Sequence, residues 1–238
     1  MPVPPSGPEA LSSEPEALSS EPEALSSESE ALASELRMLG AATLGESGAL
    51  TFPPRLRPVW SGAQLAAAAF PVRCAPGDNL AIHVAVARAP AGSALVVDVG
   101  GVAGRGYWGE VLTTGAEARG LTGLVIDGGV RDVAALEAHG YPVFSSGVAL
   151  PGATKRERGS IGLPVAVAGV PVRLGDWVVG DVDGVVIVPG TDLGAVLDAA
   201  RARTAKEQAY FDALRGGSTT VELLGLDASA VVADPTPG

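Results

Sequence analysis

Glu110, Arg131 and Asp132 are the residues of this sequence whose types and spacing could perform chemistry together. A guanidinium group offers a planar fork of donors that suits a carboxylate or a developing enolate oxygen, and an aspartate carboxylate is a hard ligand for Mg²⁺ or Mn²⁺. Because Mg²⁺ keeps several waters and accepts one or two protein carboxylates, this sparse set of acids is chemically sufficient for a metal site.

Backbone N–H groups at the start of a predicted helix supply a complementary anion pocket. The first N–H groups of a helix have no intrahelical acceptor and can bind a substrate carboxylate, so the whole set suits an α-keto acid. The simpler interpretation is that Arg131 is exposed and Asp132 complements the dipole of a helix that begins there, and spacing alone leaves the two interpretations equal. The predicted substrate-binding amides are those of Gly109, Glu110, Val111 and Leu112.

The apolar runs around these residues predict the elements that position them. ALVVDVGG and LVID are typical of buried strands, and a glycine-rich loop and a helical segment separate them. The order is therefore strand, glycine loop, helix, strand, a turn at Gly128-Gly129, and helix. Because ligands collect at the carboxyl ends of strands in such units, we expect Glu110 and Arg131-Asp132 to meet at one edge of a sheet.

Gly104, Gly106 and Gly109 also spell GxGxxG between a strand and a helix, and Asp127 ends the next strand. A dinucleotide-binding oxidoreductase uses such glycines to admit pyrophosphate and such an acid to bind ribose. Residues 100–103, however, separate the first glycine from its strand, and the C-terminal part resembles hairpins more than further βαβ units. Dinucleotide binding is therefore a lesser alternative.

The composition bounds the partners and the location. A formal net charge of -11 over 238 residues argues against a nucleic-acid partner held by general charge attraction. Cys74 is the single cysteine and cannot form an internal disulfide. The N-terminus does not resemble a signal peptide, and no run approaches the ~20 apolar residues of a membrane span. We expect a cytoplasmic protein with no nucleic-acid or membrane partner.

Residues 1–28 repeat PEALSSE with a period of seven, and Pro8, Pro15 and Pro22 fall in register. A proline inside a helix costs ~3 kcal/mol, and one leucine in each heptad is too little for a coiled-coil seam. The segment 1–28 is therefore predicted to be a disordered acidic tail. Residues 29–238 are predicted to form a single catalytic domain that opens with a helix.

The C-terminal third predicts antiparallel strands and a long helix. Valine-rich runs alternate with GD and DG turns, and Asp176, Asp181 and Asp183 are more typical of these turns than of metal ligands. A helix is expected over 191–214, with Thr191 as its N-cap.

Two polar residues outside this region also receive structural interpretations. Asp78 is predicted to cap the helix that follows it. His139 falls at the end of a helix, where the helix dipole favours a cation.

The central region resembles the family that contains the 4-hydroxy-4-methyl-2-oxoglutarate aldolases and the regulators of ribonuclease E activity A. WGEVL, AEARGLTGLVIDGGVRD, YPVFSSG and LGDWVVGDVDGVVIVP carry a similarity that covers roughly residues 36–220. The family motif is an acid, twenty residues, then Arg-Asp, which Glu110 and Arg131-Asp132 match. The resemblance implies an α/β fold, a swivelling β/β/α domain with a βαβ-type core and a C-terminal helix, assembled as a homotrimer or hexamer.

The resemblance also implies a reaction. Its aldolases are class II (metal-dependent) pyruvate aldolases, carbon–carbon lyases that use Mg²⁺ or Mn²⁺ to cleave 4-hydroxy-4-methyl-2-oxoglutarate or a related small keto acid to pyruvate and a second keto acid. They also decarboxylate oxaloacetate. By resemblance, Asp132 holds the metal, Arg131 binds the keto and hydroxyl oxygens, and the amides from Gly109 to Leu112 bind the pyruvate carboxylate. Glu207 matches an acid that a neighbouring subunit brings to the site, so the implied catalytic set is Glu110, Arg131, Asp132 and Glu207.

This chain departs from the aldolase pattern at a few positions. Glu110 stands where an aspartate is typical, Ala134 and Ala135 replace frequent acids, and Glu46 replaces another aspartate. A second hypothesis from the same family is a non-catalytic, ring-shaped regulator that binds ribonuclease E. The complete set of an acid and Arg-Asp favours the enzyme.

Overall fold

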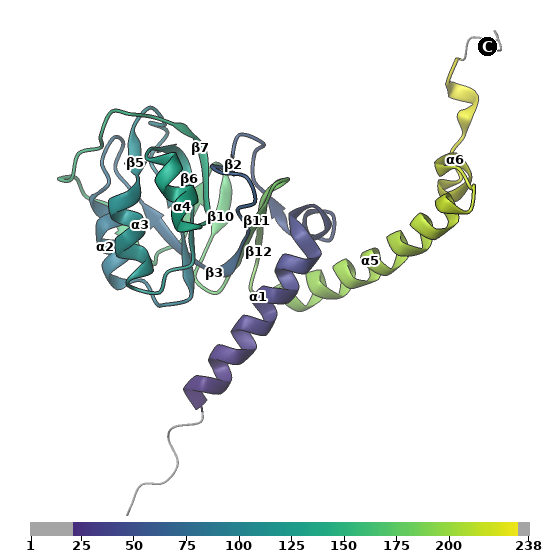
Figure 1. The fold of residues 1–238 in the computed structure, drawn as a ribbon, viewed down its shortest axis with the longest axis horizontal. Helices are drawn as coiled ribbons and strands as arrows, with labels where there is room; N and C mark the ends of the chain where they lie inside the picture. The colour runs from purple at the N-terminus through teal and green to yellow at the C-terminus, as the bar shows by residue number, and fades with distance from the viewer. Residues whose placement is uncertain (1–20, 233–238) are drawn as a thin grey trace, which may run out of the picture.

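A large mixed sheet forms the centre of the molecule (Figure 1). The computed structural model describes residues 21–232 of the 238-residue chain. The strands of the large sheet are β1 (Leu50–Thr51), β2 (Arg57–Pro58), β3 (Leu65–Arg73), β4 (Ser93–Asp98), β5 (Gly106–Trp108), β6 (Gly123–Val130), β7 (Val143–Val148), β8 (Ser160–Ile161), β11 (Trp177–Asp181) and β12 (Gly184–Val188). A separate antiparallel pair consists of β9 (Val165–Val167) and β10 (Val170–Val172).

Helices connect the parallel strands and flank the sheet. Three short helices lie in the connections β3–β4, β5–β6 and β6–β7, and Figure 1 shows them grouped on one side of the sheet. A longer helix precedes β1, and another follows β12. The helices are α1 (Glu21–Gly45), α2 (Leu80–Arg88), α3 (Glu110–Glu117), α4 (Val133–His139), α5 (Leu193–Arg215) and α6 (Thr220–Leu224), with a 3-10 turn η1 (Ala228–Ala230).

The sheet joins a parallel βαβ core to an antiparallel hairpin. Its order is β1-β12-β11-β3-β4-β6-β7-β2, in which β3, β4, β6 and β7 are parallel neighbours. The hairpin of β11 and β12 continues the sheet beyond β3 in the antiparallel sense. The predicted α/β class, βαβ-type core and C-terminal helix are confirmed, as are the antiparallel C-terminal strands.

Alternation along the strands divides the core between the two faces of the sheet. In β4, Leu95 and Val97 pack with residues of α2 and α3, whereas Ala94 and Val96 pack with the β9–β10 pair. In the antiparallel half, Val186 faces α1 and α5. The layers are therefore a small β pair, the large sheet and the helices, which is the predicted β/β/α arrangement.

The predicted turn at Gly128-Gly129 is wrong, because both glycines lie inside β6. A Cβ at Gly129 would lie 2.6 Å from the carbonyl oxygen of Arg105 and 2.7 Å from that of Ala103. Glycine is required here because β5 and the loop before it pack directly on the backbone of β6, a tertiary demand that the local turn preference of Gly-Gly does not reveal.

The predicted boundary after residue 28 falls inside α1, which begins at Glu21. Pro22 stands in the first turn, where a proline is tolerated because the N–H groups there have no intrahelical acceptor. The helix bends at Gly40, whose φ of 77° and ψ of 160° are not helical. Asp181 Oδ2 accepts the Ala41 N–H at 2.7 Å beyond the bend. Residues 1–20 lie outside the described residues, so disorder there stays a prediction.

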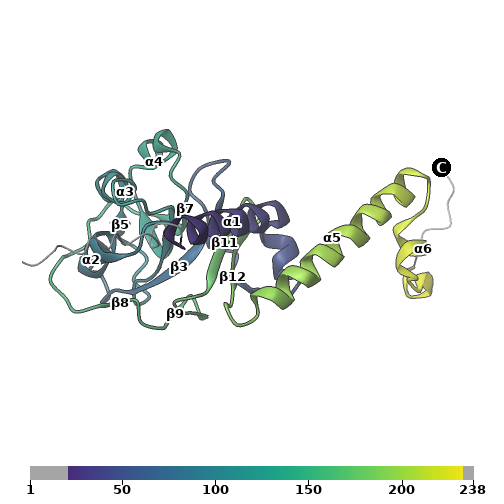
Figure 2. The same cartoon turned by 90° about the horizontal axis from the view of Figure 1, so that it is seen from below.

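The helix α5 is anchored at its start and projects from the body of the molecule (Figures 1 and 2). Its buried residues, Val196, Leu197 and Ala200, all belong to the first half of the helix. Arg201 holds it to α1 through Glu35, at 2.7 and 2.9 Å. The predicted N-cap at Thr191 is wrong by one residue, because Asp192 takes that position. Within residues 21–232, no helix is long and apolar enough to cross a membrane.

Candidate active site

The parallel pairing of β5 with β6 brings the two halves of the predicted site together. Trp108 lies opposite Val130, and the Arg131 N–H donates to the Trp108 carbonyl at 3.0 Å. The next residues along the two strands therefore emerge side by side, and the Glu110 N–H donates to Asp132 Oδ2 at 3.1 Å. The predicted meeting of Glu110 with Arg131-Asp132 at the carboxyl ends of strands is confirmed.

Two of the three glycines of GxGxxG, Gly106 and Gly109, allow this close approach. At Gly109 the backbone is extended, and a Cβ would overlap Asp132 Oδ2 and lie 3.2 Å from Arg131 Cγ. At Gly106 a Cβ would lie 3.2 Å from Arg131 Cδ. The Arg131 stem and the Asp132 carboxylate thus rest on backbone that carries no side chain, so Gly109 is fixed by packing.

The dinucleotide alternative loses its geometric basis for the same reason. Gly106 begins the strand β5, so the three glycines do not form one turn from strand to helix. Asp127, the acid required for ribose, is bonded to Arg55 through two contacts of 3.0 and 2.8 Å. Gly106, Gly109 and Asp127 are therefore engaged in contacts within the fold.

Asp132 has an unusual backbone conformation for a residue other than glycine. Its φ of 59° and ψ of 36° lie in the left-handed region, which Asp tolerates better than most residues but which still costs of order 1–2 kcal/mol. It occupies the N-cap position of α4, yet its carboxylate turns to the first N–H of α3. Asp132 therefore opens α4 through its backbone and Arg131 is exposed, as the simpler interpretation expects, but the Asp132 carboxylate bonds to α3 and caps no amide of α4.

The predicted anion pocket is partly occupied by the protein itself. The Glu110 N–H is bonded to Asp132, whereas the amides of Gly109, Val111 and Leu112 donate to no acceptor within residues 21–232. A substrate carboxylate at the start of α3 would bind these remaining donors.

The site is open to solvent and has few acids. The side chains of Glu110, Arg131 and Asp132 are 58%, 46% and 42% exposed, and Arg131 Nε lies 3.8 Å from Asp132 Oδ2. Within residues 21–232, no group of three or more His, Cys, Asp or Glu side chains could hold a metal ion. The donor set does not suit Zn²⁺, which takes three or four protein ligands, but suits a divalent ion that keeps most of its waters.

Glu207 lies outside this group. It pairs with Arg203, whose Nε is 2.8 Å from Glu207 Oε1, and both residues belong to the projecting helix α5 (Figure 1). Arg203 also pairs with Glu46, which directly follows α1, so Glu207 lies near the C-terminal end of α1. The contribution of Glu207 from a neighbouring subunit stays a prediction.

His139 is a neighbour of the site that sequence reasoning missed. Its Nδ1 lies 2.8 Å from Glu117 Oε2, and its Nε2 lies 3.9 Å from Glu110 Oε1. The helix-end position was the available signal, but it indicated only a favourable dipole. The packing of α3 against α4 creates these contacts, and no local pattern encodes it.

Asp78 holds the 154–157 loop, which follows the segment beside Arg131. Its buried carboxylate accepts hydrogen bonds from the Leu80 N–H at 2.8 Å, as expected near a helix start, although Asn79 takes the N-cap position. It also holds the 154–157 loop, accepting from Thr154 Oγ1 at 2.7 Å and from the amides of Arg156 at 2.6 Å and Glu157 at 3.2 Å. Burial raises the pKa of Asp78, but these four donors outweigh it and lower the pKa to about 2.

The segment just before the 154–157 loop adjoins Arg131. A Cβ at Gly152 would lie 3.7 Å from Arg131 Nη1. The carbonyl of Pro151 accepts the Gly106 N–H at 2.8 Å. The Asp78 carboxylate therefore helps to fix the surface against which Arg131 lies.

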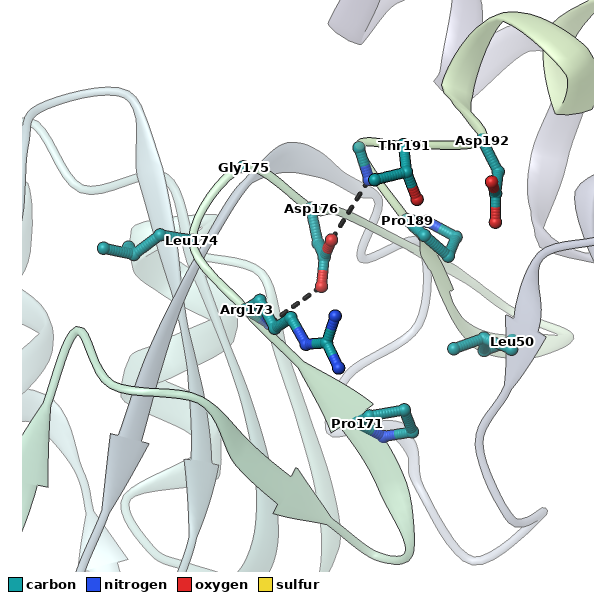
Figure 3. A pocket seen from close by; sticks show the side chains of 10 residues that line it. Leu50, Pro171, Arg173, Leu174, Gly175, Asp176, Pro189, Thr191 and Asp192 are labelled. Atoms are coloured by element: carbon teal, nitrogen blue, oxygen red, sulfur yellow. Dashed lines mark hydrogen bonds between the residues drawn. The ribbon is translucent and has the colours of Figure 1, made fainter.

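A pocket of about 660 Å³ lies elsewhere, near the start of α5 (Figure 3). Asp176 accepts hydrogen bonds there from the Arg173 N–H at 2.8 Å and the Gly190 N–H at 3.1 Å. It is a turn acid, as predicted. The predicted catalytic residues are absent from the pocket's described lining, which consists of Leu50, Pro171, Arg173, Leu174, Gly175, Asp176, Pro189, Gly190, Thr191 and Asp192.

Known proteins are similar to this chain in sequence and in fold. Residues 38–187 match the RraA-like family, described as Aldolase/RraA. A protein of Halalkalibacterium halodurans, provisionally named 4-hydroxy-4-methyl-2-oxoglutarate aldolase, is 34% identical over 154 residues, which are 65% of this chain and 73% of that protein. An uncharacterised protein of Pseudomonas syringae pv. tomato superposes with a TM-score of 0.73 at 28% identity, covering 82% of this chain and 92% of that one. The RNA-processing inhibitor RraA of Thermus thermophilis gives a TM-score of 0.54 at 26% identity, covering 60% of this chain and 85% of that one.

Proposed function

This chain belongs to the RraA-like family, and we propose that it is a divalent-metal-dependent pyruvate aldolase. Its substrates would be 4-hydroxy-4-methyl-2-oxoglutarate and related small keto acids, with oxaloacetate decarboxylation as a side activity. One observation carries the proposal: Arg131 and Asp132 lie against the start of α3, beside Glu110 and unoccupied backbone amides. The provisional name of the Halalkalibacterium halodurans relative supports lyase activity for the family.

The proposed binding of substrate uses donors on two elements. The amides of Gly109, Val111 and Leu112 receive the carboxylate of the pyruvate half. The Arg131 guanidinium then faces the keto and hydroxyl oxygens, where its planar fork can donate to both. Asp132 would hold Mg²⁺ or Mn²⁺, which when bound supplies charge stabilisation at the keto oxygen.

The proposed reaction is a retro-aldol cleavage. The hydroxyl group loses its proton, the carbon–carbon bond beside it breaks, and the electron pair enters the pyruvate enolate. Arg131 donors stabilise the charge that develops on the enolate oxygen. A water held by Glu110 takes the hydroxyl proton and returns a proton to the enolate carbon. Loss of CO₂ from oxaloacetate leaves the same enolate, so one site can perform both reactions.

A neighbouring subunit is part of the proposal. The exposed site and the projecting α5 support a homotrimer or hexamer in which Glu207 of one copy closes the site of another. That acid would join the water held by Glu110 in proton transfer.

A second candidate function is regulation of ribonuclease E without catalysis. The likeness to the RNA-processing inhibitor RraA favours it. A pull-down with purified ribonuclease E distinguishes the two: the enzyme proposal expects no retention, and retention together with inactivity on keto acids would establish the regulator.

The fork of Arg131 gives a sharp test of the enzyme proposal. Arg131→Lys keeps the charge but loses bidentate donation, so kcat/KM for pyruvate release should fall about 100-fold. Arg119→Lys, at an exposed arginine just after α3, is the matched control and should match wild type. Equal kcat/KM for wild type and Arg131→Lys would refute the role of Arg131.

A further inference from the structure

His139 lies between two carboxylates of one helix face. Glu110 and Glu117 are two turns apart on α3, so their side chains share a face. The imidazole of His139, at the end of α4, has Nδ1 2.8 Å from Glu117 Oε2 and Nε2 3.9 Å from Glu110 Oε1. Each ring nitrogen therefore faces a different acid.

The backbone around His139 is firmly held, so the ring has a defined place. Gly140 ends α4 in the left-handed conformation. The next residue, Tyr141, stacks on Trp108 with ring centroids 6.1 Å apart, and the Trp108 Nε1–H donates to Thr113 Oγ1 at 2.7 Å. The chain at the end of α4 is thus tied to α3 through the buried Trp108 of β5, and the Glu117 bond then fixes the rotation of the His139 ring.

Glu110, in contrast, needs to be held. Its side chain is 58% exposed, and His139 is its side-chain partner within the described residues. Its backbone N–H is bonded to Asp132, so its carboxylate starts beside the site but can rotate about several bonds. A carboxylate that must hold a reacting water loses rate when it samples other orientations.

Building on the proposed function, we infer that His139 is a positioning residue for Glu110. In its protonated form His139 carries an N–H on both ring nitrogens, so Nδ1–H donates to Glu117 and Nε2–H attracts Glu110 Oε1, 3.9 Å away. This contact leaves Oε2 of Glu110 for the water that exchanges protons with the substrate. This role accounts for a glutamate where the related aldolases typically carry an aspartate. A side chain one methylene shorter would not span the distance to Nε2.

Two substitutions at His139 distinguish positioning of Glu110 from a purely structural link between α3 and α4. The amide nitrogen of Asn stands near the place of Nδ1, and that of Gln stands near the place of Nε2. His139→Asn should keep the bond to Glu117 and lose the contact with Glu110, lowering kcat for pyruvate release about 10-fold with KM within about 2-fold of wild type. His139→Gln should lose less than about 3-fold in kcat, because its amide still reaches Glu110. The reverse order, with His139→Asn the more active variant, would overturn the inference.

A double-mutant cycle covers the case in which His139→Asn destabilises the fold. Glu110→Asp alone should lower kcat because the shorter acid cannot reach Nε2. Adding His139→Asn to that variant should cause no further loss of kcat, whereas losses that multiply would show that the contact contributes nothing. Wild-type protein inactive on every keto acid would refute the proposed function together with this role. Active wild type with an equally active His139→Asn would refute only the role of His139.

Discussion

Replacement of Asp78 by Asn should destabilise the protein and disturb the active site from a distance. Asp78 is 1% exposed, and its carboxylate accepts four hydrogen bonds, three of them from the 154–157 loop. An asparagine keeps the shape but removes the charge, and its NH₂ group faces donors where an acceptor is required. The loop should therefore loosen, and with it the surface that Gly152 presents to Arg131.

The pKa of Asp78 gives the size of the effect. Lowering it from 3.8 to about 2 corresponds, at about 1.4 kcal/mol for each pKa unit, to roughly 2.5 kcal/mol of stability at neutral pH. Because the folded-state pKa is depressed, this contribution is complete above about pH 4 and is lost as the pH falls toward about 2. Hydrogen-bond donors that face the asparagine NH₂ group have no acceptor, which adds about 1 kcal/mol or more to the loss of unfolding free energy at pH 7.

Urea unfolding of wild type and Asp78→Asn at pH 7, 5 and 3 measures this difference. The gap in unfolding free energy should be roughly 2.5 kcal/mol or more at pH 7 and should narrow at pH 3. Asp183→Asn, which removes the same charge from an exposed turn residue, should change the free energy by less than about 0.5 kcal/mol. A gap for Asp78→Asn below about 0.5 kcal/mol at pH 7, or one that widens as the pH falls, would refute the reasoning.

Three further outcomes follow from the packing. Gly109→Ala places a methyl on the Asp132 carboxylate and should abolish pyruvate release, whereas Gly104→Ala, whose added Cβ meets no atom within 4 Å, should retain it in the same assay; equal rates for the two variants would contradict the packing argument. Tyr141→Phe removes a buried hydroxyl that makes no hydrogen bond of good geometry within residues 21–232, so the melting temperature should stay level or rise, and a fall of several degrees would show that the hydroxyl bonds to the nearby Gly123 backbone. Burial raises the pKa of Cys74 to about 12, so a thiol-specific reagent at pH 8 should label it only after unfolding; fast labelling of the native protein would refute its burial.

Periodicity and strand-end geometry account for most of what could be predicted. Apolar runs marked β4 and β6, and the rule that parallel strands gather ligands at their carboxyl ends placed Glu110 near Arg131-Asp132. These inferences succeed because a buried strand leaves a continuous apolar signal and because chain direction fixes where its end lies.

The missed features depend on contacts between distant parts of the chain. Gly128-Gly129 has the local signature of a turn, and only the close packing of β5 on β6 requires it in a strand. Asp78 bonds to residues 76 to 79 positions away, and His139 faces an acid on another helix. The left-handed Asp132 follows from the same cause, since its conformation is set by the contact with α3.

Pyruvate release from 4-hydroxy-4-methyl-2-oxoglutarate tests the central claim most directly. The assay compares wild type with Mg²⁺, wild type after EDTA treatment and Mg²⁺ restoration, and Asp132→Asn, which keeps a residue type that tolerates the left-handed backbone while removing the charge. We predict activity with Mg²⁺, loss of activity with EDTA, recovery when Mg²⁺ is restored, and no activity in Asp132→Asn. Wild type that releases no pyruvate, or an Asp132→Asn variant as active as wild type, would contradict the central claim.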